Sequence, residues 1–182
     1  MKKLLFLAML LILIPINAYA VSLNTLQTNT SQYIKICETQ TATLYLEPNS
    51  IKVVRSSHPY YTLQTKVYYV LYDTSSILKV LYTVNYDYNR SFSALSKRKL
   101  YENPNYSKQE IRNYVLTEAE KDSGISVGSK TDCVYDLNGN YLYKSSIPVR
   151  SSKADFGTIL YTTANIIYYH QTQCKEYFFP PY

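Results

Sequence analysis

Two histidines and three cysteines are the residues of this chain best suited to bind a metal or to act as a nucleophile. His170 and Cys174 would share one face of a helix at i and i+4, where they could hold a metal or form a cysteine–histidine pair. A zinc site usually needs three or four protein ligands, and no further ligand is apparent beside them. A helical pair also lacks an orienting third group and an oxyanion hole. We therefore favour a disulfide or plain packing at Cys174, and expect no metal and no cofactor.

The remaining residues with catalytic potential have simpler explanations. His58 precedes a proline in a loop and is interpreted as solvated. Glu118 and Glu120 are two residues apart on a predicted helix, so their carboxylates do not face each other. The chain has only four glycines and no glycine-rich phosphate loop. We assign no catalytic residue and expect that the protein is not an enzyme.

The first 20 residues have the pattern of a secretion signal. Lys2 and Lys3 precede an apolar run over residues 4–16, and Ala18-Tyr19-Ala20 places small residues where a signal peptidase reads. The alternative is a retained anchor, but spanning a bilayer takes about 20 apolar residues. We expect a signal peptide over residues 1–20, cleaved after Ala20. The protein would then be periplasmic, on the cell surface or secreted, with membrane contact only through the signal peptide before cleavage.

The remaining 162 residues have the length of one domain of ordinary size. It holds 17 basic and 13 acidic residues, an excess too small to argue for a nucleic-acid partner. The one basic cluster, Lys97, Arg98 and Lys99, could contact anionic glycans or a membrane surface, or could be the solvated face of a helix. The 22 tyrosines suit a sheet with a partly solvent-exposed face and also suit protein contacts.

The chain is organised around residues 59–88, which predict two antiparallel strands joined by a turn at 73–76. Apolar and polar side chains alternate along both strands, as expected for a sheet with one covered face. Another element must therefore cover the apolar side. The polar side is the candidate binding face, with Gln64, Lys66, Tyr68, Tyr72, Lys79 and Thr83.

The flanking segments supply the rest of the fold. Residues 21–30 are polar and expected to be a flexible N-terminus, and residues 31–182 form a single domain. Short strands are predicted at 32–38, 42–47 and 51–54, with a turn at 47–50, and again near residue 130 and at 141–143. A helical insertion at about 89–124 contains a capping box at Ser107 and Glu110 and would end at Gly124. Asn138-Gly139 is a strong hairpin signal.

A last helix is predicted from residue 153 to 171, after a polar connector at 148–153. Its apolar stripe consists of Phe156, Ile159, Leu160, Thr163, Ala164 and Ile167. This stripe is the natural cover for the central hairpin. The fold class is therefore α+β, with an antiparallel sheet of about six strands, a C-terminal helix packed on one face and an inserted helical hairpin.

The odd number of cysteines allows at most one bridge within the chain. Strand alternation places Cys37 on the face of its strand away from Ile34 and Ile36, whereas Cys133 shares a face with Tyr135. We favour a Cys133–Cys174 disulfide with Cys37 as a free thiol, although sequence alone does not settle connectivity.

Several short segments resemble the surface-adhesin protein E family of exported bacterial proteins. They are Tyr33-Ile34-Lys35-Ile36, the segment 43–51 (TLYLEPNSI), Tyr135 to Asn140, and a C-terminal helix followed by Cys174-Lys175. The resemblance implies a six-stranded antiparallel sheet with a C-terminal helix on its concave side, held by a disulfide. It also implies adhesion to host extracellular proteins, and dimers. This chain differs in having no cysteine just after its apolar run and in carrying an insertion over 85–125.

These observations lead to one preferred function and two alternatives. The preferred function is a non-enzymatic secreted or cell-surface interaction protein, an adhesin for host extracellular-matrix or bacterial envelope proteins, with a homodimer as an option. The alternatives are a periplasmic accessory module that binds a small ligand, and a secreted hydrolase whose residues meet only in the fold. Three polar groups converging in a pocket would favour the enzyme, whereas a flat exposed aromatic patch would favour the interaction protein.

Overall fold

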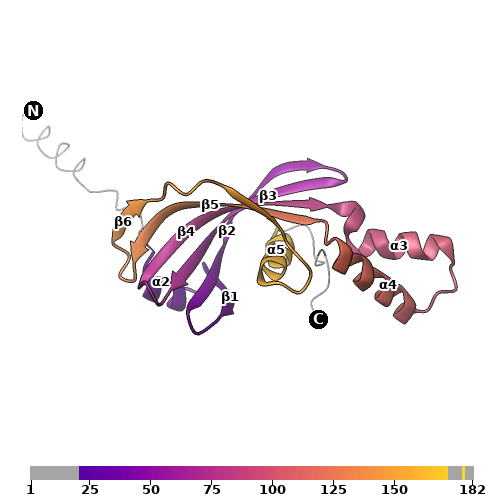
Figure 1. Cartoon of the computed structure of the whole chain (residues 1–182), viewed down its shortest axis with the longest axis horizontal. Coiled ribbons are helices and arrows are strands. Elements are labelled where there is room, and N and C mark those ends of the chain that lie inside the picture. The colour runs from indigo at the N-terminus through magenta and orange to yellow at the C-terminus, as the bar shows by residue number, and fades with distance from the viewer. Residues whose placement is uncertain (1–20, 172–177, 179–182) are drawn as a thin grey trace, which may run out of the picture.

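The protein is a single antiparallel sheet with a helix packed on it and two helices extending from one end (Figure 1). A computed structural model describes residues 21–171 and 178. The strand order is β1-β2-β3-β4-β5-β6, and β7 pairs with β5 alongside β6. The strands are β1 (Ile34–Glu38), β2 (Ala42–Ser57), β3 (Tyr60–Leu71), β4 (Ser76–Asp87), β5 (Ile125–Asp136), β6 (Tyr141–Lys144) and β7 (Arg150–Lys153). The α+β fold class predicted from the sequence is confirmed.

The central hairpin of β3 and β4 forms as predicted. The two strands pair without a bulge from Tyr60↔Asp87 to Leu71↔Ser76. Their alternation separates two faces because successive side chains of a strand point to opposite sides. We call the side that carries Leu63 and Val84 the inner face and the other side the outer face.

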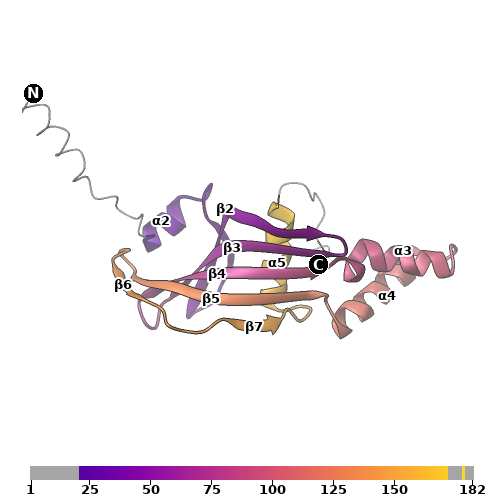
Figure 2. The ribbon, with the colours of Figure 1, turned by 90° about the horizontal axis from the view of Figure 1, so that it is seen from above.

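Helix α5 (Ile159–His170) covers the inner face, as predicted. Of its predicted stripe, Phe156 precedes the helix and Ile159 is 52% exposed, whereas Thr163, Ala164 and Ile167 are buried. It lies across the strands in Figure 2. Ala164 and Ile167 are fully buried, and the Tyr86 hydroxyl donates to the Ala164 carbonyl at 2.7 Å. Phe178 packs against the ring of Tyr86 on the same side. The helix begins later than predicted, with Thr158 as its N-cap, because Gly157 at φ +79° interrupts the helical path.

Helix α2 (Leu23–Thr28) covers part of the outer face. Residues 21–30 were expected to be flexible, and this expectation is wrong. The Ser22 side chain caps the helix by accepting from the Thr25 N–H at 3.1 Å. Leu26 is 1% exposed and belongs to a cluster with Tyr68 and Ile77. The sheet is therefore covered on both faces, over different areas.

The helical insertion extends beyond the ends of β4 and β5 (Figures 1 and 2). It comprises the short 3₁₀ helix η1 (Tyr88–Arg90), α3 (Phe92–Glu102) and α4 (Lys108–Lys121). The predicted capping box of Ser107 and Glu110 is present at the start of α4. The helix ends at Lys121 with Asp122 as C-cap, three residues before Gly124.

Two features of the strands differ from the prediction. Strand β2 is continuous through the expected turn at 47–50, where its pairing with β3 is irregular between Glu47 and Lys52. Strand β7 lies in a segment expected to be only a connector, and it pairs with β5 from Ser126↔Lys153 to Ser129↔Arg150. Within residues 21–171, no helix has the length and apolar character needed to cross a membrane.

Candidate functional site

The predicted binding face is the outer face of the sheet, but α2 divides it. Under α2 the face is buried, and beyond α2 it remains accessible. We call the accessible part the open half; none of its residues is buried. It consists of Thr62, Gln64 and Lys66 from β3, Thr83 and Asn85 from β4, and Ser126 and Gly128 from β5.

Tyr68 and Tyr72 belong to the covered part: Tyr68 is buried and Tyr72 is half-buried, so neither is the open surface residue that was predicted. Tyr68 is 3% exposed and donates its hydroxyl to Glu47 Oε2 at 2.9 Å. Burial, reinforced by the nearby carboxylate, raises the pKa of Tyr68 well above its ordinary value. The Tyr72 hydroxyl is hydrogen-bonded to that of Thr43 at 2.8 Å. Both tyrosines therefore support the fold under α2.

The charged members of the predicted face are paired with acids. Lys66 Nζ lies 3.6 Å from a carboxylate oxygen of Glu47, and Lys79 Nζ lies 3.0 Å from one of Asp132. The hydrogen bond from Lys79 is the main reason that the pKa of Asp132 is lowered. Pairing leaves these two lysines with little net charge to offer a partner.

Gln64 and Thr83 lie side by side on the open half, where Gln64 Nε2 donates to the Thr83 hydroxyl at 3.3 Å. Of the six predicted residues, these two fit a binding surface best.

A second accessible surface, which the sequence analysis missed, lies at the edge formed by β6 and β7. Five large apolar side chains are roughly half exposed there: Tyr141, Leu142, Tyr143, Ile147 and Val149, at 47–62%. They are five of the twelve exposed large apolar residues in the described part of the chain. Both strands pair with β5 alone among the described strands, so their other side is unpaired. We call residues 141–153 the β6–β7 edge.

Exposure on both sides of β6 distinguishes this edge from an ordinary half-buried strand. Tyr141, Leu142 and Tyr143 are consecutive, so their side chains point to opposite faces, yet all three are exposed. Native proteins usually protect a free sheet edge because its unpaired N–H and C=O groups can pair with another chain. Exposed apolar side chains on a free edge make this surface a candidate interaction site.

The predicted basic cluster on α3 is divided. Lys97 and Arg98 are exposed. Lys99 is instead bound within the insertion: its Nζ lies 2.9 Å from Glu102 and 4.6 Å from the centre of the Tyr106 ring. The structure therefore does not present the three side chains as one basic patch.

The prediction of a Cys133–Cys174 disulfide is wrong, because Cys133 is a buried free thiol. Cys133 aligns with Lys79 on the outer face, whereas α5 covers the inner face. Its Sγ donates to the Tyr135 hydroxyl at 2.9 Å. Cys174 lies outside the described residues. Cys37 is a half-buried free thiol that packs against the inner-face core, and burial raises its pKa.

The described residues contain no group of three or more His, Cys, Asp or Glu placed to hold a metal ion. His58 packs against Tyr88, with ring centres 5.3 Å apart. His170 ends α5, and its proposed partner Cys174 is among the residues not described.

Comparison of the chain with protein-family models, curated proteins and solved structures finds no match. The resemblance to the surface-adhesin protein E family therefore stays a prediction.

Proposed function

We propose that this protein is an exported, non-enzymatic interaction protein that binds another protein through the β6–β7 edge. The observation that carries the proposal is the gathering of half-exposed apolar side chains on an unpaired sheet edge. Export rests on the signal-like pattern of residues 1–20. A host extracellular-matrix protein or a bacterial envelope protein is the expected partner, as for an adhesin.

The edge suits a partner that adds an extended strand to the sheet. In that mode the main chains of the two proteins pair, and alternate side chains supply specificity. Tyr143 pairs with Val134 of β5 on one side and would leave its other side for the partner strand. Tyrosine is enriched in protein interfaces because its ring buries a large area while its hydroxyl keeps a polar contact.

The charge of the edge indicates an acidic partner segment. Residues 141–153 contain Lys144, Arg150 and Lys153 and no Asp or Glu. Two copies of the edge paired with each other would bring these cations together, and like charges across an interface are costly. A different protein with an acidic extended segment therefore fits better than a homodimer through this edge.

The test is co-precipitation of the tagged protein with envelope extracts and with purified matrix proteins. We expect a double variant, Leu142→Ser with Tyr143→Ser, to weaken capture by at least about a hundredfold, since each buried apolar side chain contributes about 1.5–3 kcal/mol. The matched control is Val54→Ser with Tyr101→Ser, which removes side chains that are 58% and 94% exposed elsewhere. Equal capture by both variants contradicts the proposal.

A further inference from the structure

A cavity of about 340 Å³ lies at the end of the open half, between the β2–β3 hairpin and the base of the helical insertion. Its floor is a row of three polar side chains on adjacent strands: Thr62 of β3, Asn85 of β4 and Ser126 of β5. Thr62 donates to Asn85 Oδ1 at 2.9 Å, and Asn85 Nδ2 lies 3.4 Å from the Ser126 hydroxyl. The floor therefore offers both donors and acceptors.

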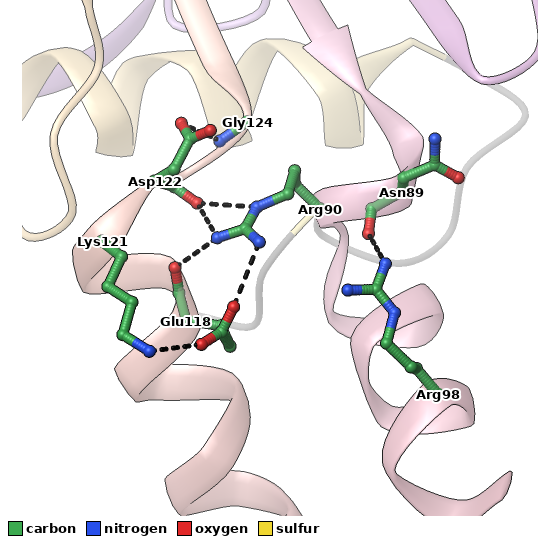
Figure 3. A network of polar contacts seen from close by, with 7 residues as sticks. All are labelled: Asn89, Arg90, Arg98, Glu118, Lys121, Asp122 and Gly124. Atoms are coloured by element: carbon green, nitrogen blue, oxygen red, sulfur yellow. Dashed lines mark hydrogen bonds and ion pairs between the residues drawn. The ribbon is translucent and has the colours of Figure 1, made fainter. Parts of the chain in front are cut away.

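Two carboxylates line one wall. Asp87 and Asp122 each accept one backbone N–H through Oδ1, from Asn89 and Gly124 respectively. Their second oxygens have no hydrogen-bond partner among the described residues and can accept from a ligand. The wall is held in place by Arg90, whose guanidinium donates to the Asp122 carbonyl, as Figure 3 shows.

The two ends of the cavity are basic. Arg55 continues the floor row on β2, and Lys153 continues it on β7. Neither makes an ion pair with a described residue. Neighbouring strands are about 4.8 Å apart, so this row of five residues spans about 19 Å. The Arg55 guanidinium lies 5.2 Å from the centre of the Tyr60 ring, which is 46% exposed.

This combination selects among ligand classes. Two cations and two carboxylates balance each other, which disfavours a polyanion. A floor of hydroxyl and amide groups disfavours an apolar ligand, because burying them without partners is costly. A ligand with many hydroxyl groups can donate to the carboxylates, accept from Arg55 and Lys153, and lay an apolar ring face on Tyr60.

We propose that this cavity binds a short neutral oligosaccharide laid across the strands. The volume lies near the lower end of the roughly 300–1,000 Å³ typical of ligand sites. An elongated ligand is favoured over a single sugar because the donors and acceptors extend along the row rather than meeting at one point. The cavity shares Lys153 with the β6–β7 edge, but oligosaccharide binding here does not require a protein bound at that edge.

The test is titration of the purified protein with neutral tetrasaccharides of glucose, galactose, mannose and N-acetylglucosamine, followed by amide NMR. We expect saturable shifts from at least one of them, confined to the amides of residues 55–62, 85–87, 122–126 and 151–153. Asn85→Ala should weaken that binding about tenfold, since a lost hydrogen-bond partner costs about 1–3 kcal/mol. Asn113→Ala, which removes an exposed amide from α4, should leave it unchanged.

A second variant separates loss of binding from loss of fold. Lys153→Gln changes an exposed side chain and is expected to leave the thermal midpoint unchanged while weakening the oligosaccharide. The proposal is overturned if none of the four tetrasaccharides binds at millimolar concentration, or if the shifts lie elsewhere. It is equally overturned if a sulfated polysaccharide binds at this cavity more tightly than every neutral sugar, with affinity that falls steeply with salt.

Discussion

Arg90, at the start of the helical insertion, is hydrogen-bonded to the C-terminal end of α4, and its removal tests how α4 is held (Figure 3). Its Nη2 donates to the carbonyls of Glu118 at 2.6 Å and Asp122 at 2.9 Å. Its Nε also reaches the Asp122 carbonyl, at 3.2 Å, and its Nη1 lies 3.2 Å from the Glu118 carboxylate. One guanidinium thus supplies donors to the Asp122 carbonyl just past the end of α4, where a helix lacks its own donors. It also gives the Glu118 carbonyl a second donor beside the Asp122 N–H at 3.1 Å.

We expect Arg90→Ala to destabilise α4 by about 2 kcal/mol. A hydrogen bond to a charged group contributes about 1.5–3 kcal/mol, but the Glu118 carbonyl keeps its backbone donor and the Asp122 carbonyl lies at a helix end that water can reach, so the losses do not add in full. Hydrogen exchange at the α4 amides should then accelerate about thirtyfold. Exchange at the central amides of β3 and β4 should change less, because these strands are held mainly by each other and by β2 and β5.

Two further substitutions make this result interpretable. Arg90→Lys keeps the positive charge but loses the planar guanidinium with its several N–H donors, and should accelerate amide exchange in α4 to an intermediate extent. Arg98→Ala is the matched control, since Arg98 is exposed and makes one long hydrogen bond, 3.4 Å, to the Asn89 carbonyl. If Arg90→Ala and Arg98→Ala accelerate α4 exchange equally, the role assigned to Arg90 is refuted.

Three other predictions concern the rest of the fold. Leu26→Ala should lower the free energy of unfolding by about 2 kcal/mol in urea denaturation, because it removes the buried side chain through which α2 packs on the sheet. A loss below about 0.5 kcal/mol, usual for surface positions, would show that α2 does not pack on the sheet. Asp132→Asn should cost stability above about pH 4 and progressively less below it, since the carboxylate whose pKa Lys79 lowers stabilises only while ionised. Equal losses measured by denaturation at pH 3 and pH 7 would exclude that ion pair. Cys133, which is 7% exposed, should react with a thiol reagent in the native protein far more slowly than the half-buried Cys37, and rapid labelling of Cys133 would contradict its burial.

Much of the fold was predictable because its signals are local. The alternation over residues 59–88 predicted the central hairpin, and the spacing of Ser107 and Glu110 predicted the start of α4. The apolar stripe through Ala164 and Ile167 correctly identified the helix that covers the sheet. Each of these patterns depends on residues a few positions apart, where strand or helix geometry fixes which side chains share a face.

The features that were missed depend on contacts between distant segments. Helix α2 has only six residues and one buried side chain, Leu26, which is too little for a periodic pattern. Strand β7 is exposed throughout and exists only through its pairing with β5. Alternation correctly placed Cys133 beside Tyr135, but it does not say which face α5 covers. The β6–β7 edge was missed because its apolar residues have the pattern of an ordinary strand. Their exposure depends on the absence of a further described strand beside β6 and β7, which the local sequence does not reveal.

The central claim is that a partner protein binds the β6–β7 edge, and site-specific photo-crosslinking tests it most directly. A photoreactive amino acid is placed at Tyr143, and in a separate variant at Tyr101, which is 94% exposed on the insertion. After irradiation with envelope extract or matrix proteins, we expect a discrete adduct from position 143, inhibited by Leu142→Ser, and none from position 101. No adduct from position 143, or the same adduct from both positions, would contradict the proposal.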